Sequence, residues 1–371
     1  MIVYKDKKYQ FYEYFNEQNG FLFRSDSLQS NKNPIMRSFP ELLDIGIMGT
    51  CLASKYNICK NFGVDCYQKA KILKRPNMNY YDYKRIIDQC KGKVFQIALG
   101  GAGDPNKHEL FKEILKITRE NMIIPNYTTS GYLLTDLEAE LTKNYCGAVA
   151  VSFYSNLSNN KETNPHTIRA INLFLKHGCT TNIHYVLSKD NISEAIFRLK
   201  NNLFPQGINA VIFLLYKPSG FGIMNKTLSY NDLELKELID IIDKNHFNFD
   251  VGFDTCFTPA LLSYSNTIDF SSIDFCEAAR FSMYIDCELN AYPCSFDSTE
   301  RKFCISLKGK TISEVWTSDQ FNQFRKKQET NCMSCIKREY CLGGCSLYPS
   351  IDICNKKNNS LKESLTCPNP S

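Results

Sequence analysis

The sequence predicts an α/β protein: an open, partial (β/α)6 barrel of the TIM type, followed by a small Cys-rich domain. Strand-like apolar runs alternate with helical patterns from about residue 41 to about residue 250, which indicates a parallel sheet covered by helices. Six such units favour a partial barrel over the eight units of a closed one, although a doubly wound sheet has almost the same periodicity. After residue 250 the helical periodicity weakens and cysteines become frequent.

This change of character divides the chain into three predicted parts. Residues 1–40 are too short for a packed domain, and we expect them to form a strand or hairpin extension laid against the barrel. Residues 41–250 are the predicted barrel, and residues 251–371 are the predicted Cys-rich domain.

The predicted strands are apolar runs that end at turn residues. They are ELLDIGIMGT (41–50), VFQIALGG (94–101), IIPNYTTSG (123–131), GAVAVSFY (147–154), TTNIHYVLS (180–188) and INAVIFLLYKP (208–218). The fourth run is almost continuously apolar, as is typical of a buried parallel strand.

The predicted helices carry apolar residues along one face. They span residues 79–90, 108–121, 135–145, 164–178, 193–202 and 230–245. The fourth has Asn164 as a cap signal, Pro165 in its first turn and Gly178 at its end. In a partial barrel or a doubly wound sheet alike, a ligand is expected at the C-terminal ends of the strands.

Composition limits the classes of partner and compartment. The net charge of +5 is modest and the lysines are spread along the chain, so neither nucleic acid nor a membrane surface is favoured. No apolar run approaches the roughly 20 residues that span a bilayer. The N-terminus MIVYKDKKYQFYEYF lacks the apolar core of a signal peptide, and we therefore expect a cytoplasmic protein.

The unusual feature is the cysteine content, which is 17 residues. We interpret Cys90, Cys146 and Cys179 as buried small apolar residues. The others fall into two groups, one in CLASKYNICKNFGVDCYQ (51–68) after the first strand and one between residues 256 and 367. Such clustering favours metal ligation, because a chain in a reducing cytosol has little use for so many disulfides. A secreted disulfide-rich protein is the alternative, but it would need a signal peptide.

The second group contains a CxxC-x5-C-x3-C motif at Cys332, Cys335, Cys341 and Cys345. Structural zinc and an iron–sulfur cluster are both compatible with this spacing. With Cys294 in a Tyr-Pro-Cys context before it and another Cys after it, the motif resembles the SPASM domain, the C-terminal extension of many radical S-adenosylmethionine enzymes. The resemblance covers roughly residues 41–371, since these enzymes are built on a partial (β/α)6 barrel with cluster-ligating cysteines after the first strand.

The resemblance implies two auxiliary [4Fe–4S] clusters in the C-terminal domain. The first would be held by Cys256, Cys276, Cys294 and Cys345. The second would be held by Cys332, Cys335, Cys341 and either Cys354, which is favoured, or Cys367. Cys287 and Cys304 are then spare, and either could replace Cys256 or Cys276. Leu289 stands where family members usually have a Gly, which weakens the turn but removes no ligand.

The resemblance also implies a radical-generating [4Fe–4S] cluster at Cys51, Cys59 and Cys66, although their spacing is longer than the family's usual Cys-x3-Cys-x2-Cys. A longer loop can still bring three thiolates to three irons at a modest closure cost. Three cysteines leave one iron without a protein ligand, and S-adenosylmethionine chelates such an iron through its amino and carboxylate groups. An aromatic residue often precedes the third Cys in the family, whereas here Tyr67 follows it.

Several strand-end residues match cofactor-binding positions of the family. Gly100, Gly101 and Asp104 resemble the Gly-Gly-Glu segment, whose backbone takes the methionyl amino group. Ser130 belongs to a Thr-Ser-Gly that resembles the family's Thr-Asn-Gly, and Ser152 lies where members contact the ribose. We interpret Lys217 either as reaching the active site or as a surface lysine before a turn, and we expect the five histidines to be structural or at the surface.

These expectations favour a radical S-adenosylmethionine oxidoreductase that matures a ribosomally made peptide, by a thioether, a C–C cross-link or another side-chain or α-carbon modification. Its partners would be a peptide or protein substrate and an electron donor such as flavodoxin or ferredoxin. An anaerobic sulfatase-maturing enzyme, which makes formylglycine, is the first alternative. It is disfavoured because Ser295, not Asp, follows Cys294, with Asp297 further on. The second alternative is a non-catalytic zinc-binding protein.

Overall fold

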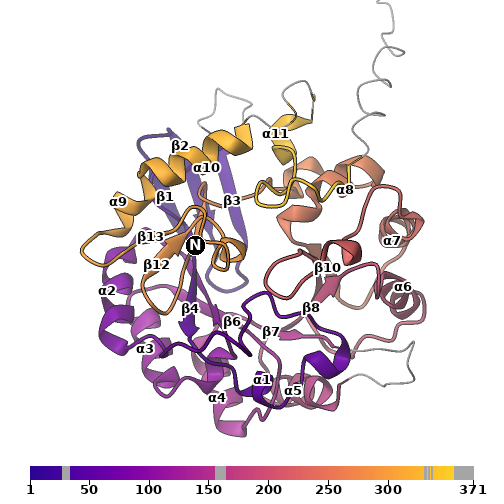
Figure 1. The fold of residues 1–371 in the computed structure, drawn as a ribbon, viewed down its shortest axis with the longest axis horizontal. Helices are drawn as coiled ribbons and strands as arrows, with labels where there is room; N and C mark the ends of the chain where they lie inside the picture. Colours follow the sequence, from indigo (N-terminus) through magenta and orange to yellow (C-terminus); the bar gives the residue numbers. More distant parts are fainter. Residues whose placement is uncertain (27–33, 155–163, 330–331, 333–334, 336, 355–371) are drawn as a thin grey trace, which may run out of the picture.

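One ten-stranded sheet forms the body of the molecule (Figure 1). The structure is a computed structural model, and it describes residues 1–26, 34–154, 164–329, 332, 335 and 337–354. The strand order is β10-β9-β8-β7-β6-β5-β4-β11-β12-β13, in which β4 to β10 and the β4–β11 pair run parallel and β11, β12 and β13 pair antiparallel.

The strands of this sheet include every strand that the sequence predicts. They are β4 (Leu42–Met48), β5 (Gln96–Gly101), β6 (Ile124–Thr129), β7 (Val149–Ser152), β8 (Thr181–Leu187), β9 (Ala210–Leu215), β10 (Asp250–Phe253), β11 (Ser282–Ile285), β12 (Asn290–Tyr292) and β13 (Ile305–Ser306). The predicted strands correspond to β4 through β9, which confirms the α/β fold class. Beyond them, β10 and β11 extend the sheet at both edges.

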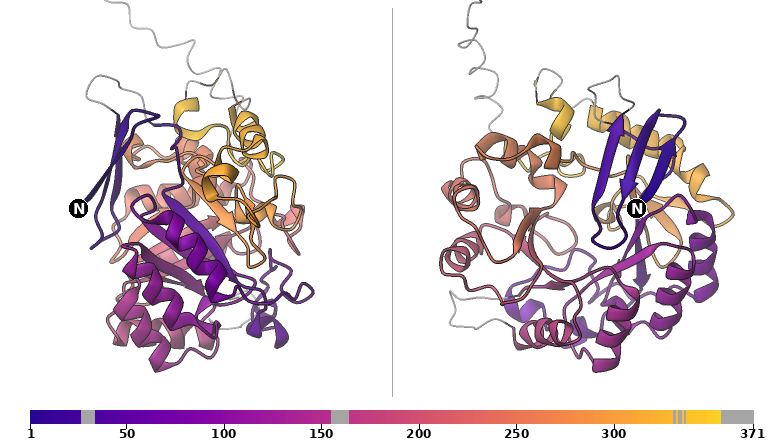
Figure 2. Two further views of the ribbon diagram at one scale, coloured as in Figure 1. Left: turned by 90° about the vertical axis from the view of Figure 1, so that its left-hand side faces the viewer. Right: turned by 180° about the vertical axis from the view of Figure 1, so that it is seen from behind.

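The helices between the strands cover the outer face of the curved sheet (Figures 1 and 2). They are α2 (Tyr80–Cys90), α3 (Phe111–Glu120), α4 (Asp136–Tyr145), α5 (Pro165–Lys176), α6 (Ile192–Lys200) and α7 (Leu233–Lys244). Local sequence defines their starts: the Asn79 side chain accepts a hydrogen bond from the Asp82 N–H, and Thr135 and Glu138 form a capping box. The C-terminal region adds α8 (Thr258–Tyr264), α9 (Ile312–Trp316), α10 (Asp319–Glu329) and α11 (Arg338–Cys341).

Alternate residues of each parallel strand face opposite sides of the sheet. On β4, Leu43, Ile45 and Ile47 are fully buried and join one core with helical residues such as Ile86. Asp44, which alternates with them, faces the opposite side, and we call this the inner face of the sheet. Ligand-binding residues on a partial barrel are expected on this face or at the strand ends above it.

The N-terminal residues form a second, antiparallel sheet of β1 (Ile2–Asp6), β2 (Phe11–Phe15) and β3 (Leu22–Asp26). Figure 2 shows it on the side of the molecule turned away from the viewer of Figure 1. Phe15 stacks on Phe95, just before β5, with ring centroids 5.1 Å apart.

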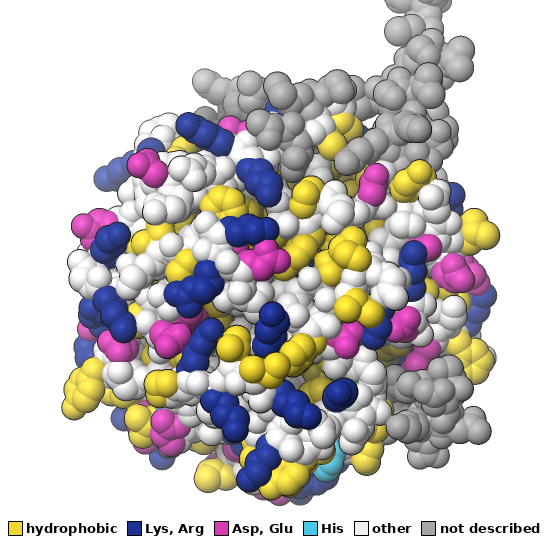
Figure 3. Space-filling view, viewed as in Figure 1, with side chains coloured by type: hydrophobic (Ala, Val, Ile, Leu, Met, Phe, Trp, Pro, Cys, Tyr) yellow, Lys and Arg dark blue, Asp and Glu magenta, His cyan; other side chains and the backbone are white. Residues whose placement is uncertain are grey.

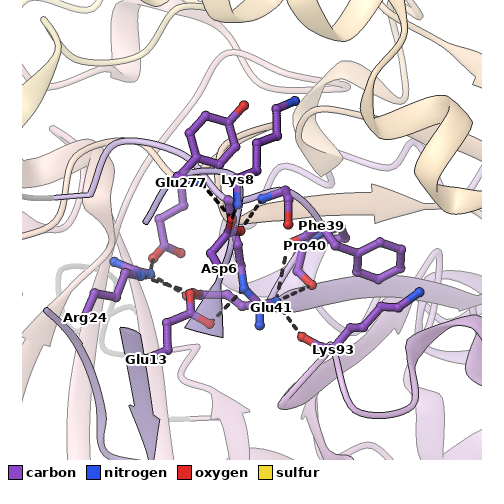
Figure 4. A network of polar contacts seen from close by, with 12 residues as sticks. Asp6, Lys8, Glu13, Arg24, Phe39, Pro40, Glu41, Lys93 and Glu277 are labelled. Atoms are coloured by element: carbon purple, nitrogen blue, oxygen red, sulfur yellow. Dashed lines mark hydrogen bonds and ion pairs between the residues drawn. The ribbon is translucent and has the colours of Figure 1, made fainter. Parts of the chain in front are cut away.

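Buried charges attach this small sheet to both larger parts of the chain (Figure 4). Arg24 on β3 forms ion pairs with Glu41, before β4, and with Glu277, at 2.7 Å in the Cys-rich region. Arg37 forms an ion pair with Glu13 on β2 at 2.8 Å, and both side chains are fully buried. Moving the small sheet away would separate these pairs and leave buried charges uncompensated, which is strongly unfavourable. The pairs therefore hold the sheet in its position.

Charged side chains are scattered over the surface. On the face in Figure 3, Lys and Arg are interspersed with Asp and Glu rather than gathered into one patch. Among the helices of the described residues, none is both long enough and apolar enough to cross a membrane.

Candidate functional site: three groups of cysteines

Cys51, Cys59 and Cys66 come together beyond the C-terminal end of β4. Cys51 caps the short helix α1 (Leu52–Lys55), and its Sγ accepts a hydrogen bond from the Ser54 N–H at 3.3 Å. Burial, with smaller contributions from Asp104, Cys51 and Cys66, raises the pKa of the Cys59 thiol to about 12. Cys66 acts on the thiol of Cys51, and both act on that of Cys59, so the structure brings these predicted ligands into one group.

The long loop that carries this group is held from the segment after β9. Asp65 accepts hydrogen bonds from the Tyr216 hydroxyl at 2.9 Å and from Lys226 Nζ at 2.8 Å. The Phe221 N–H donates to the Cys66 carbonyl at 3.1 Å. At Gly220, φ is +65° and an added Cβ would lie 2.3 Å from the Tyr67 carbonyl oxygen, so no larger residue fits this contact. The lengthened cysteine spacing is therefore accommodated by a loop with defined attachments.

The paired glycines at the end of β5 lie beside the end of β4, the strand that leads into the cysteine loop. Gly101 has φ of +121°, and a Cβ there would lie 2.4 Å from the Met48 carbonyl oxygen. Gly100 faces open space, with nothing within 4 Å of an added Cβ. A side chain at position 100 would fill this space. Without one, a ligand can approach the Gly100 backbone closely.

Asp104 and Ser130 bind each other beside the loop. Asp104 accepts hydrogen bonds from the Ser130 N–H at 2.7 Å and from its hydroxyl at 2.6 Å. Burial raises the pKa of Asp104, against the opposing effect of Ser130. Tyr154 hydrogen-bonds the Cys59 thiol and also the Ser152 side chain. Asp104 therefore lies near the thiols of Cys51 and Cys59, and Ser130 and Ser152 are each connected to them through one neighbour.

A second group of thiols gathers the predicted ligands of the first auxiliary cluster. Its members come from four separate segments and are Cys256, Cys276, Cys294 and Cys345. The Cys256 thiol hydrogen-bonds Cys345, which raises the pKa of Cys256 and lowers that of Cys345. Burial raises the pKa of Cys276 to about 12 and that of Cys294 above its usual range.

Lys217, which follows β9, points into this second group. Its side chain is buried, its Nζ lies 3.0 Å from Asp254 Oδ2, and the ammonium stands 4.5 Å from the centre of the Phe296 ring. Burial opposes the charge, but Asp254, Cys256 and Cys345 raise the pKa of Lys217 well above its usual value. The interpretation of Lys217 as a surface lysine is wrong, because the turn after β9 folds inward against the Cys-rich region.

The third group holds the predicted ligands of the second auxiliary cluster. Cys341 on α11 interacts electrostatically with Cys332, Cys335 and Cys354, and burial raises its pKa to about 11. The Ser263 hydroxyl donates to the Cys354 Sγ at 3.4 Å. Cys367, the other predicted candidate, lies outside the described residues.

The remaining cysteines have other surroundings. Cys287 interacts with Asp286 and Arg75, while Cys304 accepts a hydrogen bond from Arg301 at 3.4 Å. Cys90 and Cys179 are buried among apolar side chains, and Cys146 is half-buried. Within the part of the chain that the structure describes, no three Cys, His, Asp or Glu side chains converge closely enough to hold a single metal ion.

The inner face of the sheet carries polar residues that the sequence analysis did not single out. Thr128 on β6 and His184 on β8 form a hydrogen bond of 3.2 Å across β7, where they pair with Ala150 and Ser152 respectively. Burial lowers the pKa of His184 to about 4. Burial also raises the pKa of Asp44 to about 7, and no partner for its carboxyl is found among the described residues. The sequence could have marked Asp44 as a candidate site residue, because it is a charged residue inside the apolar run ELLDIGIMGT.

Tyr67 connects the first two cysteine groups. Its ring lies 4.9 Å from that of Phe296, which follows Cys294 by two residues. Burial raises the pKa of Tyr67 to about 12, and both Cys66 and Cys294 contribute. The residue next to the third loop cysteine thus lies between the two groups.

Comparison with known proteins gives one match to a family profile. The sequence profile of the SPASM family, described as an iron–sulfur cluster-binding domain, matches residues 276–336. Among curated proteins, none matches the chain.

Three similar solved structures illustrate the shared fold. Streptococcus suis SuiB bound to S-adenosylmethionine has a TM-score of 0.63 at 21% identity, over 84% of this chain and 74% of SuiB. SuiB bound to the precursor peptide SuiA has a TM-score of 0.63 at 20% identity, over 84% of this chain and 72% of SuiB. Native anSMEcpe with bound AdoMet and Cp18Cys peptide has a TM-score of 0.60 at 18% identity, over 86% of this chain and 94% of anSMEcpe. The predicted SPASM domain is confirmed by the profile, and the predicted partial-barrel resemblance is confirmed at the level of the fold.

Proposed function

We propose that this chain, which carries a SPASM domain on the fold of SuiB and anSMEcpe, is a radical S-adenosylmethionine enzyme that modifies a peptide or protein. The observation that carries the proposal is the group of Cys51, Cys59 and Cys66 at the C-terminal end of β4, beside the open space at Gly100. Three thiols suit a [4Fe–4S] cluster in which one iron has no protein ligand. Cys51, Cys59 and Cys66 would hold this cluster, and it would supply the one electron, taken from an external donor, that cleaves the S–C5′ bond of S-adenosylmethionine to methionine and a 5′-deoxyadenosyl radical.

The surrounding residues have distinct tasks in this proposal. The Gly100–Gly101 backbone receives the methionyl end of S-adenosylmethionine, since Gly100 leaves room for it. Asp104 fixes Ser130 at the end of β6, and Ser152 faces the ribose. Asp65 and Gly220 hold the cysteine loop in place, so that the thiols do not have to be ordered when the cofactor binds.

The proposed substrate is a side chain or α-carbon of a peptide, presented on the inner face of the sheet. SuiB and anSMEcpe were both solved with peptides bound. Asp44, Thr128 and His184 provide hydrogen-bonding groups on that face of this chain. A thioether, a C–C cross-link or another modification of a ribosomally made peptide fits this site, with flavodoxin or ferredoxin as the proposed electron donor.

Formylglycine formation is less well supported, although the fold is also that of anSMEcpe. Ser295 follows Cys294 directly, and the nearby Asp297 is buried. Both Asp297 carboxylate oxygens accept backbone hydrogen bonds, from Lys302 at 3.0 Å and from Phe303 at 2.8 Å. Because both oxygens are already used to hold the backbone of this turn, the carboxylate is poorly placed to act as a base.

Anaerobic reconstitution tests the proposal against a zinc-binding alternative. The enzyme should take up about twelve irons per chain, absorb near 400 nm and form 5′-deoxyadenosine when dithionite is added. Cys59→Ala should lose this activity, whereas Cys146→Ala, the matched half-buried cysteine of the barrel, should keep it. Zinc uptake with no visible absorbance would overturn the proposal.

A further inference from the structure

Lys217 is a cation in an enclosed place, beside four thiols that the sequence assigns to one cluster. Its side chain is 2% exposed, and its charge acts on Cys256, Cys276, Cys294 and Cys345. A buried charge is costly unless it is paired and hydrogen-bonded. The ammonium meets this condition through Asp254, through the Leu215 carbonyl at 3.0 Å and through the Phe296 ring.

We propose that Lys217 is a positioning residue that raises the reduction potential of the iron–sulfur cluster held by Cys256, Cys276, Cys294 and Cys345, with Asp254 acting in the opposite direction. This inference rests on the proposed function, because it requires that these thiols hold a cluster. Reduction transfers one electron from an external reductant to the cluster, so the reduced cluster is more negative by one charge. A fixed cation nearby stabilises that state, and a fixed anion destabilises it.

The geometry of Asp254 explains why a lysine is needed here. Asp254 follows β10 directly and lies two residues before Cys256, and its Oδ2 also accepts a hydrogen bond from the Leu215 N–H at 3.3 Å. Its Oδ1 is buried and has no hydrogen-bond partner among the described residues. Without Lys217, this carboxylate would stand uncompensated beside the thiols. The pair therefore sets the local charge, and its members should shift the potential with opposite signs.

The other cysteine groups differ in this respect, which makes the effect specific. The charged residue that acts on the thiols of both Cys51 and Cys59 is Asp104, an anion. For Cys341 and Cys354 of the third group, the neighbouring charges are other thiols and Asp352. Only one of the cluster signals should therefore respond to changes at Lys217.

A redox titration of the reconstituted holoenzyme, followed by electron paramagnetic resonance, tests the inference. Lys217→Met should shift the midpoint potential of one cluster signal to a lower value, because the cation is lost and Asp254 remains. Lys217→Arg keeps the charge and should leave that potential close to the wild-type value. Asp254→Asn should shift it upward, and the double variant Lys217→Met/Asp254→Asn should fall between the two single variants. Lys200→Met, which removes a half-exposed lysine paired with Glu237, is the matched control and should shift nothing.

The outcomes separate this inference from the proposed function. A wild-type chain that takes up no iron overturns the proposed function and the inference with it. Full iron content with unchanged potentials in Lys217→Met overturns the inference alone. If Lys217→Met loses the cluster, Asp254→Asn decides, because it keeps the lysine: an unchanged or lowered potential in Asp254→Asn contradicts the inference.

Discussion

The two cysteine groups on either side of Tyr67 have opposite electrostatic surroundings. Cys51, Cys59 and Cys66 lie in an irregular loop near an anion, Asp104, and border the open space at Gly100. Cys256 and its three partners lie near a buried cation, Lys217. We therefore propose that the three-thiol group beside Gly100 exchanges a ligand and that the four-thiol group beside Lys217 holds a cluster permanently.

The largest expected effect comes from removing one thiol from each group. Cys59→Ala should lower 5′-deoxyadenosine formation by about 1,000-fold or more, because the cluster that binds S-adenosylmethionine is lost. Cys276→Ala should lose as much iron but keep this cleavage within about tenfold of the wild type, when assayed without substrate. Product formation is measured by chromatography after dithionite reduction. If 5′-deoxyadenosine formation fell equally in both variants, the two cysteine groups would not differ in their role in S-adenosylmethionine cleavage.

The next effect concerns the open space at the end of β5. Gly100→Ala should raise the KM for S-adenosylmethionine by about 10- to 100-fold while changing stability by less than about 1 kcal/mol, because its Cβ meets only the ligand's space. Gly101→Ala should instead destabilise the barrel by more than about 1 kcal/mol, since its φ is +121° and its Cβ would meet Met48. Thermal unfolding and steady-state kinetics distinguish the two. A normal KM in Gly100→Ala would mean that S-adenosylmethionine does not approach this backbone.

A smaller effect is expected from loosening the cysteine loop. Asp65→Ala removes the acceptor for Tyr216 and Lys226, and it should reduce S-adenosylmethionine cleavage by about tenfold. Asp190→Ala is the control, because Asp190 also pairs with Lys226, at 3.3 Å, but is 61% exposed and does not contact the loop. Iron content should stay unchanged in both. Equal activity in the two variants would show that the loop keeps its geometry without Asp65.

The sequence predicted much of this arrangement, but for different reasons in different places. Strands β4 to β9 were found because each is an apolar run bounded by turn residues. β10 and β11 were missed because each is only four residues long and neither lies in a long apolar run such as GAVAVSFY, which surrounds the equally short β7. The assignment of the cysteines to three groups came from the resemblance to SPASM-containing enzymes, because the spacing of the cysteines alone is also compatible with zinc. Lys217 stayed ambiguous because a sequence does not reveal which way a turn folds. Leu289, which replaces a usual Gly, adopts a left-handed φ of 66° and is nevertheless buried.

The smallest predicted effect is on stability and comes from Asp44. Its carboxyl has no partner among the described residues, whereas that of Asp254 is paired with Lys217. The Asp44 carboxyl ionises near its usual pKa of 3.8 in the unfolded chain but at about 7 in the folded protein. Between these values the folded state binds more protons, so its stability falls as the pH rises. Asp44→Asn should therefore be more stable than the wild type by about 1–3 kcal/mol at pH 8, with a smaller difference at pH 5. Denaturant titrations at the two pH values measure this, and an advantage that is larger at pH 5 would contradict the sign.

We propose above all that the long loop after β4 presents one free iron to S-adenosylmethionine. The most direct measurement is the electron paramagnetic resonance spectrum of the dithionite-reduced, iron-loaded protein before and after S-adenosylmethionine is added. The account predicts that one cluster signal changes on addition, and that this signal is missing in Cys59→Ala but present in Cys276→Ala. A spectrum that S-adenosylmethionine leaves unchanged, or a responsive signal that survives in Cys59→Ala, would contradict it.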